Sequence, residues 1–184
     1  MKPVSEWHRL AALFPAPDTL AANIEHVPVS AVPEPYRTLL VHNNHMTATM
    51  ELFHGTPVDV KVLARHIEAE TYNRKIILTR PDTGAVVQFA FAQFDLHSVS
   101  EAVRSDILSE RIPLGRVLIS HGIACQIEVN AILKVTLGAG LSELLHSPVN
   151  VLTYGRAAQI LCNDKPTFNV IEVLAPIDPE SRRA

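Results

Sequence analysis

Apolar and polar residues alternate with a period of two along several segments of the chain. The alternation over residues 58–64 is typical of a half-buried strand. Residues 72–80 and 85–94 show the same character and flank a Pro- and Gly-containing sequence at 81–84. Because proline and glycine favour tight turns, these two segments are predicted to form a hairpin.

The second half of the chain repeats this arrangement. Residues 123–137 carry apolar side chains on one period-two face. Residues 153–162 and 167–175 flank the turn sequence Asn-Asp-Lys-Pro at 163–166 and predict a closing hairpin. The pattern therefore predicts about five or six strands, a number compatible with one sheet.

Helical spacing appears between these strands. Thr47 is a candidate N-cap and Gly55 a C-terminal stop for one helix. Residues 96–108 have apolar positions at helical spacing, a short helix is predicted to start at Pro113, and residues 141–145 predict another. Since hairpins join neighbouring strands and helices do not alternate strictly with strands, an antiparallel α+β fold is favoured over a parallel α/β fold.

The predicted domain covers residues 36–178. Residues 1–35 are rich in proline and contain one short helical pattern at 7–14, so most of this arm is expected to be irregular and to lie over the domain. Residues 179–184 are expected to be a C-terminal tail.

Composition restricts the classes of function. The 184 residues include 47% hydrophobic and 19% charged residues and carry a formal net charge of -3, which is typical of a single globular domain. Because no basic stripe is present, neither nucleic acid nor a membrane surface is an expected partner. The N-terminus lacks a continuous apolar stretch, so the cytoplasm is the expected location.

Cysteine and histidine usage gives no sign of a metal site. Cys125 and Cys162 lie in apolar runs without CxxC spacing and are predicted to be separate, reduced core residues. His42 and His45 have metal-compatible spacing, but no nearby ligand completes a set. We therefore expect no metal. Oligomeric state is not predicted.

Three charged residues share strand faces with apolar residues. Alternation places Arg74, Arg156 and Glu172 each on the same face as core side chains. An unpaired buried ion is costly, so each charge must be paired internally, reach water at a sheet edge, or be held for a ligand. The pattern alone leaves these alternatives open.

Four segments in order resemble the chorismate pyruvate-lyase family. They are His-Met-Thr at 45–47, Tyr-Asn-Arg-Lys-Ile-Ile-Leu at 72–78, Ile-Pro-Leu-Gly-Arg-Val-Leu at 112–118, and the closing stretch 154–176. The resemblance implies a single antiparallel sheet whose helical flaps close over an interior ligand site.

The resemblance also implies roles for individual residues. Arg74 and the backbone N–H groups of Met46 and Leu114 would hold an aromatic carboxylate, and Glu172 would face the ring hydroxyl. Arg74 and Glu172 are thus the predicted catalytic residues. The predicted substrate-binding residues are Met46, Thr47, Leu114, Gly115 and Arg156.

The implied function is a cofactor-independent lyase that removes pyruvate from chorismate and leaves a hydroxybenzoate, with 4-hydroxybenzoate as the favoured product. A planar guanidinium suits the carboxylate of such a dianion. The alternative from another class is a non-catalytic effector-sensing domain of the same fold. The short, non-basic arm argued against that alternative, because such regulators carry a DNA-binding domain ahead of the sensor. The third hypothesis is a catalytically inactive member of the family.

Overall fold

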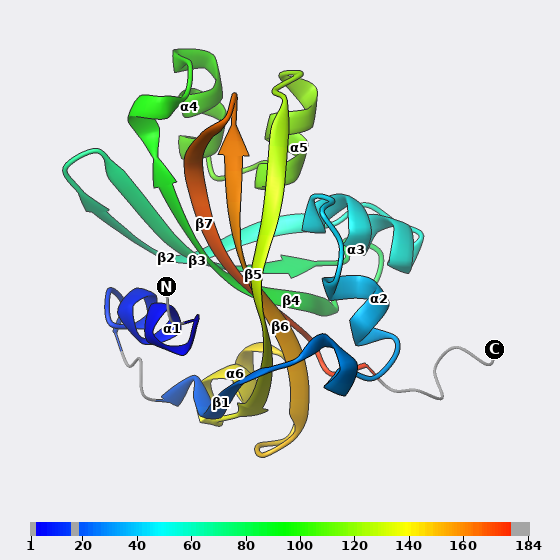
Figure 1. Ribbon diagram of the computed structural model, residues 1–184. Coiled ribbons are helices and arrows are strands. Elements are labelled where there is room, and N and C mark those ends of the chain that lie inside the picture. The colour runs from blue at the N-terminus through cyan, green and yellow to red at the C-terminus, as the bar shows by residue number, and fades with distance from the viewer. Residues whose placement is uncertain (1–2, 16–18, 178–184) are drawn as a thin grey trace.

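The computed structural model describes residues 3–15 and 19–177, which fold around one antiparallel sheet (Figure 1). Seven strands occur in the order β1-β5-β6-β7-β4-β3-β2. Their bounds are Ala21–Val27 (β1), Asp59–Glu68 (β2), Thr71–Thr79 (β3), Val86–Asp95 (β4), Cys125–Leu137 (β5), Leu152–Cys162 (β6) and Lys165–Leu174 (β7). The predicted α+β class with a single antiparallel sheet is confirmed, as are both predicted hairpins, β3–β4 and β6–β7.

Six α-helices connect or cover these strands within the described residues. Their bounds are Pro3–Ala11 (α1), Tyr36–Leu40 (α2), Met46–His54 (α3), Glu101–Leu108 (α4), Leu114–Ser120 (α5) and Ala139–Leu144 (α6), with short 3-10 turns at Val29–Ala31 (η2) and Leu96–Ser98 (η3). In the part of the chain that the structure describes, none of the helices is both long and apolar enough to cross a bilayer.

The start of α3 differs from the prediction by two residues. His45, with extended backbone, occupies the N-cap position, so Thr47 lies inside the first turn and is not the cap. The predicted stop is correct, because Gly55 adopts a left-handed backbone with φ 65° after the last helical residue. Glycine takes this conformation without steric cost.

The proline-rich arm is more regular than the sequence predicted. Helix α1 buries Trp7 against the rings of Phe89 and Phe91, with centroid separations of 6.1 and 5.3 Å. Strand β1 pairs with β5 and forms one edge of the sheet. The largely irregular path predicted for residues 1–35 is therefore wrong for these two elements. The predicted tail, residues 179–184, lies outside the described residues.

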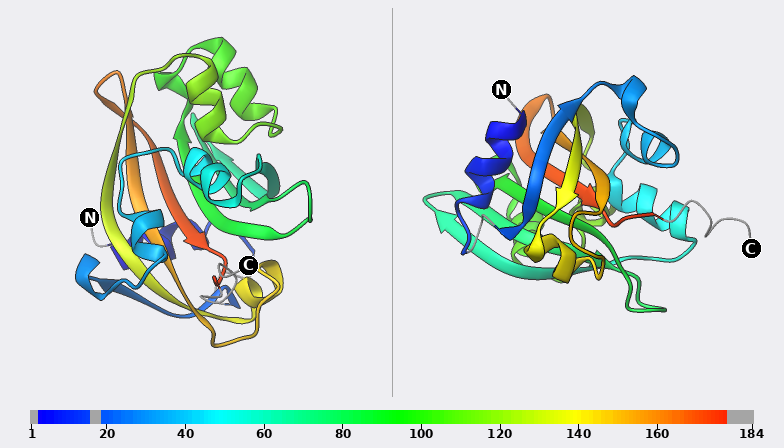
Figure 2. Two further views of the ribbon diagram at one scale, coloured as in Figure 1. Left: turned by 90° about the vertical axis from the view of Figure 1, so that its right-hand side faces the viewer. Right: turned by 90° about the horizontal axis from the view of Figure 1, so that it is seen from below.

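The two faces of the sheet have different covers. One face carries Phe89, Phe91 and Val173 and packs against α1 and α6. The opposite face is covered by α2 to α5, which gather on one side of the curved sheet (Figure 2, left). There the apolar residues form two separate clusters, one around Phe94 and Phe168 under α4 and α5, the other around Met50 and Ile76 under α2 and α3.

The cysteines are not separate, reduced residues as predicted. Cys125 and Cys162 lie directly opposite each other in the β5–β6 register and form a disulfide bond. The prediction failed because two cysteines in different strands can be recognised as partners only when the pairing of those strands is known.

Candidate ligand-binding site

A cavity lies between the two apolar clusters, above the centre of the sheet and below the first turns of α3 and α5. All seven predicted site residues line this cavity. The other lining residues are His45, Ile76, Leu78, Gln88, Ala90, Ala92, Pro113, Ile127, Ile160 and Val170. The floor of the cavity is low where β4 presents the small side chains of Ala90 and Ala92. About 40 Å³ remains free inside, which is room for only a few water molecules.

Arg74 projects from β3 and is almost completely enclosed. The residue is 1% exposed, and its Nε and Nη1 groups have no hydrogen-bond partner among the residues that the structure describes. Its guanidinium carbon lies 4.9 Å from the centre of the Phe94 ring, an arrangement that favours a cation. Two N–H groups of a buried cation are thus left available to another molecule.

Tyr72 and Glu110 partly compensate the buried Arg74 cation. The Tyr72 hydroxyl donates a 2.6 Å hydrogen bond to Glu110 Oε1. Burial lowers the pKa of Arg74 below its usual value, and the neighbouring Tyr72 and Glu110 partly oppose that effect. Within the described chain no carboxylate lies within ion-pair distance of Arg74. The guanidinium therefore lacks the direct counterion that a buried charge normally requires.

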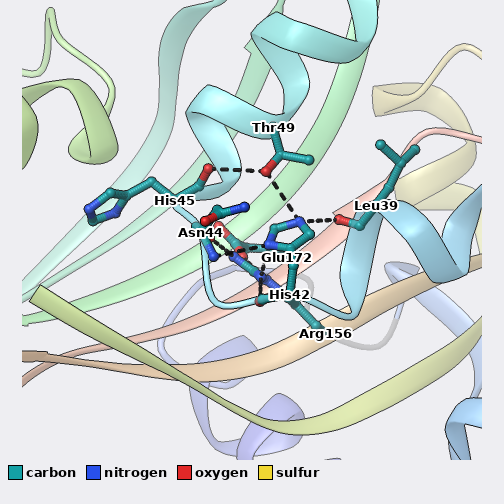
Figure 3. A network of polar contacts seen from close by, with 7 residues as sticks. All are labelled: Leu39, His42, Asn44, His45, Thr49, Arg156 and Glu172. Carbon is teal, nitrogen blue, oxygen red and sulfur yellow. Dashed lines mark hydrogen bonds and ion pairs between the residues drawn. The ribbon is translucent and has the colours of Figure 1, made fainter.

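Arg156 and Glu172 form an internal ion pair (Figure 3). They lie opposite each other on β6 and β7, and Arg156 Nε donates a 2.7 Å hydrogen bond to Glu172 Oε2. The remaining Arg156 nitrogens donate to the backbone oxygens of His42 and Asn44, at 3.0 and 3.3 Å. Arg156 thus ties the segment before α3 to the sheet, and one oxygen of Glu172 is engaged in that arrangement.

Burial favours the neutral form of the two histidines near the cavity. His42 Nε2 lies 2.8 Å from the Leu39 carbonyl, while its Nδ1 accepts a 3.1 Å hydrogen bond from the Asn44 backbone N–H. Burial lowers the pKa of His42, as does the nearby Arg156 charge, and burial lowers the pKa of His45. Neither imidazole adds positive charge to the cavity at neutral pH. Nowhere in residues 3–15 and 19–177 do three metal-ligating side chains come together.

The roof of the cavity is built from two helix starts. Met46 and Leu114 are the first residues of α3 and α5, and neither helix has a side-chain cap. Their backbone N–H groups find no acceptor within the described residues, as expected for the first turn of a helix. An ion pair between Arg116 and Glu51 joins the two helices on the outer side. The roof is therefore one connected unit that carries free donors on its inner side.

Gly115 allows the two helices of the roof to approach each other closely. A Cβ at this position would lie 2.9 Å from Thr47 Oγ1 and 3.0 Å from His45 Cβ, closer than normal packing. We expect Gly115→Ala to push α5 away from α3 and lower the free energy of unfolding by about 1–3 kcal/mol, the usual cost of overpacking. Urea unfolding would measure this change, with Ser120→Ala at the exposed end of α5 as the control. An equal stability of both variants would contradict this packing role.

Gln88 is the cavity residue that the sequence predictions missed. It is 2% exposed, and its Oε1 atom is buried with no partner in the described structure. The signal was present, since Gln88 shares the period-two face of β4 with Ala90 and Ala92. A neutral amide on an apolar face is a weaker signal than a charge, so the strand pattern did not single out Gln88.

Comparison with known proteins shows the fold but no family. No family model matches the chain. A protein named "Putative lyase MJ0807" from Methanocaldococcus jannaschii is 24% identical over 142 residues, which cover 76% of this chain and 77% of that protein. The crystal structure of the effector domain of PhnF from Mycobacterium smegmatis matches with a TM-score of 0.56 at 12% identity, over 74% of this chain and 91% of that domain.

A longer crystal structure of PhnF from the same organism matches with a TM-score of 0.55 at 12% identity, over 74% of this chain. The match spans 65% of that longer structure. The chain therefore has the α+β fold found in the PhnF effector domain. These matches share the fold and not a close sequence.

The comparisons correct the main functional prediction. Both structural matches are to PhnF, one of them to its effector domain alone, and neither is to a chorismate lyase, so the predicted release of pyruvate from chorismate is contradicted. They favour the alternative that the sequence left open, a sensing domain of the same fold. The short N-terminal arm does not decide between these two functions, because it bears on a separate DNA-binding domain and not on the ligand cavity.

Proposed function

We propose that this chain is a small-molecule-binding domain of the effector-sensing type, which holds an anionic ligand in the cavity without converting it. The observation that carries the proposal is Arg74, a buried guanidinium that lines the cavity and whose Nε and Nη1 groups have no partner among the described residues. A planar guanidinium binds a carboxylate through two parallel hydrogen bonds. The free N–H groups of Met46 and Leu114 supply further donors from the roof.

The rest of the cavity suits a ligand whose remaining part is compact and apolar. Ile76, Leu78, Ile160 and Val170 provide apolar walls, with the two alanines below. Because the free space is only about 40 Å³, a ligand the size of benzoate requires α3 and α5 to move outward. The Arg116–Glu51 ion pair and the Gly115 packing would make the two helices move together. Ligand occupancy is thereby converted into a shift of an outer surface, which is what a sensing domain requires.

Glu172 fits a structural role in this proposal. Its Oε2 accepts from Arg156, whose other nitrogens fix the segment before α3. The pair supports one side of the roof and leaves Arg74 as the anchor for the anion.

Calorimetric titration of the purified chain with benzoate and benzamide tests the proposal, because the two molecules have the same shape and differ in charge. We expect binding of benzoate and none of benzamide. Inorganic phosphate in parallel distinguishes a general anion site from a carboxylate site. Equal binding of benzoate and benzamide would contradict the role of Arg74, and release of pyruvate from chorismate would overturn the non-catalytic proposal.

A further inference from the structure

Two residues hold all the buried side-chain atoms that lack a hydrogen-bond partner within the described chain. They are Arg74, through Nε and Nη1, and Gln88, through Oε1. Both line the same cavity. Under the proposed function, the anionic group of the ligand is the partner of the Arg74 N–H groups. The Gln88 oxygen is an acceptor, so it needs a hydrogen-bond donor instead.

The sheet places these two groups at opposite ends of the cavity floor. Arg74 on β3 is paired with Ala92 on β4, and Gln88 lies on the same face of β4 four positions earlier, paired with Leu78. At about 3.3 Å per residue, this corresponds to roughly 13 Å along the strand between the two backbone positions. Ala90 and Ala92 lie between them and leave the floor open. A single molecule lying along β4 therefore meets both side chains.

An amide at the Gln88 position has no structural partner in the ligand-free fold. None of the described residues hydrogen-bonds its Oε1 atom, although Gln88 is 2% exposed. A buried acceptor without a partner destabilises a fold, and an apolar side chain of similar size would fill the space without that effect. A ligand that donates a hydrogen bond at this end of the cavity supplies the missing partner of Gln88 Oε1.

We infer that the ligand carries a hydrogen-bond donor, a hydroxyl or an amine, at the end remote from its anionic group, and that Gln88 selects for this donor. The inference rests on the proposed function, because it assumes that Arg74 holds the anion of the same molecule. It narrows the ligand class from small carboxylates to carboxylates with an apolar body and a remote donor.

Ligands of matched size separate the effect of the hydrogen-bond donor on affinity from the effect of ligand volume. The probes are the meta and para isomers of hydroxybenzoate and aminobenzoate, each compared with the corresponding toluate, in which a methyl group replaces the donor. For the wild-type chain we expect at least one donor-bearing isomer to bind about tenfold more tightly than its toluate. In Gln88→Leu that ratio falls to within about twofold, while toluate binding is retained.

Gln93→Leu is the matched control, because Gln93 lies on β4 but on the opposite face. There its side chain hydrogen-bonds Asn73 and Arg9, at 2.9 Å each. We expect Gln93→Leu to lower the melting temperature and leave ligand preference unchanged. Gln88→Leu is expected to keep or raise the melting temperature of the ligand-free protein, which a residue with a structural hydrogen bond would not do.

The outcomes distinguish this inference from the proposed function. Toluate binding without any preference for a donor would overturn the role of Gln88 and leave the anion site intact. A preference that survives in Gln88→Leu would also overturn it. Failure of all these carboxylates to bind would contradict the proposed function and the inference together.

Discussion

Replacing Arg74 with methionine is expected to abolish carboxylate binding and, at the same time, to stabilise the ligand-free protein. The variant loses charge-assisted hydrogen bonds, which contribute about 1.5–3 kcal/mol each, so benzoate affinity should fall by about a hundredfold or more. It also removes a buried cation that has no direct counterion. Apolar replacement of buried charges stabilises proteins by about 1–4 kcal/mol when the new side chain packs well.

We expect these two opposite effects for a residue that serves ligand binding and does not stabilise the fold. Titration with benzoate would measure the first effect, and urea unfolding without ligand the second. Arg65→Met is the control, because Arg65 pairs with Arg74 across β2 and β3 but its side chain is 66% exposed. That variant should change neither quantity substantially. An Arg74→Met protein that is clearly destabilised, or that binds benzoate normally, would show that Arg74 has a structural role instead.

Most of the sheet could be predicted because its strands obey a simple period. The hairpins β3–β4 and β6–β7 were found from alternation together with Pro, Gly and Asn-Asp turn sequences. Strand β1 was missed because edge strands need not alternate, and its residues are exposed or partly exposed in no regular pattern of two. Nearby prolines further weakened the signal. Its pairing with β5 depends on contacts between distant segments, which local patterns do not contain.

The sequence predicted residues that line the cavity, but it left open which of them form an ion pair. Alternation found the three charges on apolar faces, but which charge pairs with which depends on strand register. From the closing turn, where Cys162 pairs with Lys165, a regular ladder would place Arg156 opposite Ile171. An irregularity between Ile160 and Leu161 shifts the register by one residue and brings Arg156 opposite Glu172. A one-residue shift reverses which side chains share a face.

That irregularity determines which charged residue of the cavity is left for a ligand. With Glu172 held by Arg156, the remaining guanidinium of Arg74 is the one left for a ligand. The predicted arrangement, in which Arg74 and Glu172 act on one substrate and Arg156 binds it, did not pair Arg156 with Glu172. The residues that the resemblance to chorismate lyases selected thus line one cavity, and the comparisons corrected the function.

Breaking the Arg156–Glu172 pair is expected to have the largest effect on stability. Arg156→Met leaves the Glu172 carboxylate without its ion-pair partner in a site where its side chain is 12% exposed, and removes the donors to the backbone oxygens of His42 and Asn44. Removal of one partner of a buried pair typically costs about 3–5 kcal/mol. Urea unfolding should show a loss of this size.

The double variant Arg156→Met with Glu172→Leu separates the two causes of that loss. Because it removes the stranded carboxylate as well, it should recover most of the stability, leaving only the contribution of the two backbone contacts. This partial recovery follows from the asymmetry between a buried ion pair, which contributes little net stability, and a single buried ion, which is strongly unfavourable. A double variant as unstable as Arg156→Met would mean that Arg156 acts chiefly by fixing the segment before α3. A single variant within about 1 kcal/mol of the wild type would mean that the pair is not structural at all.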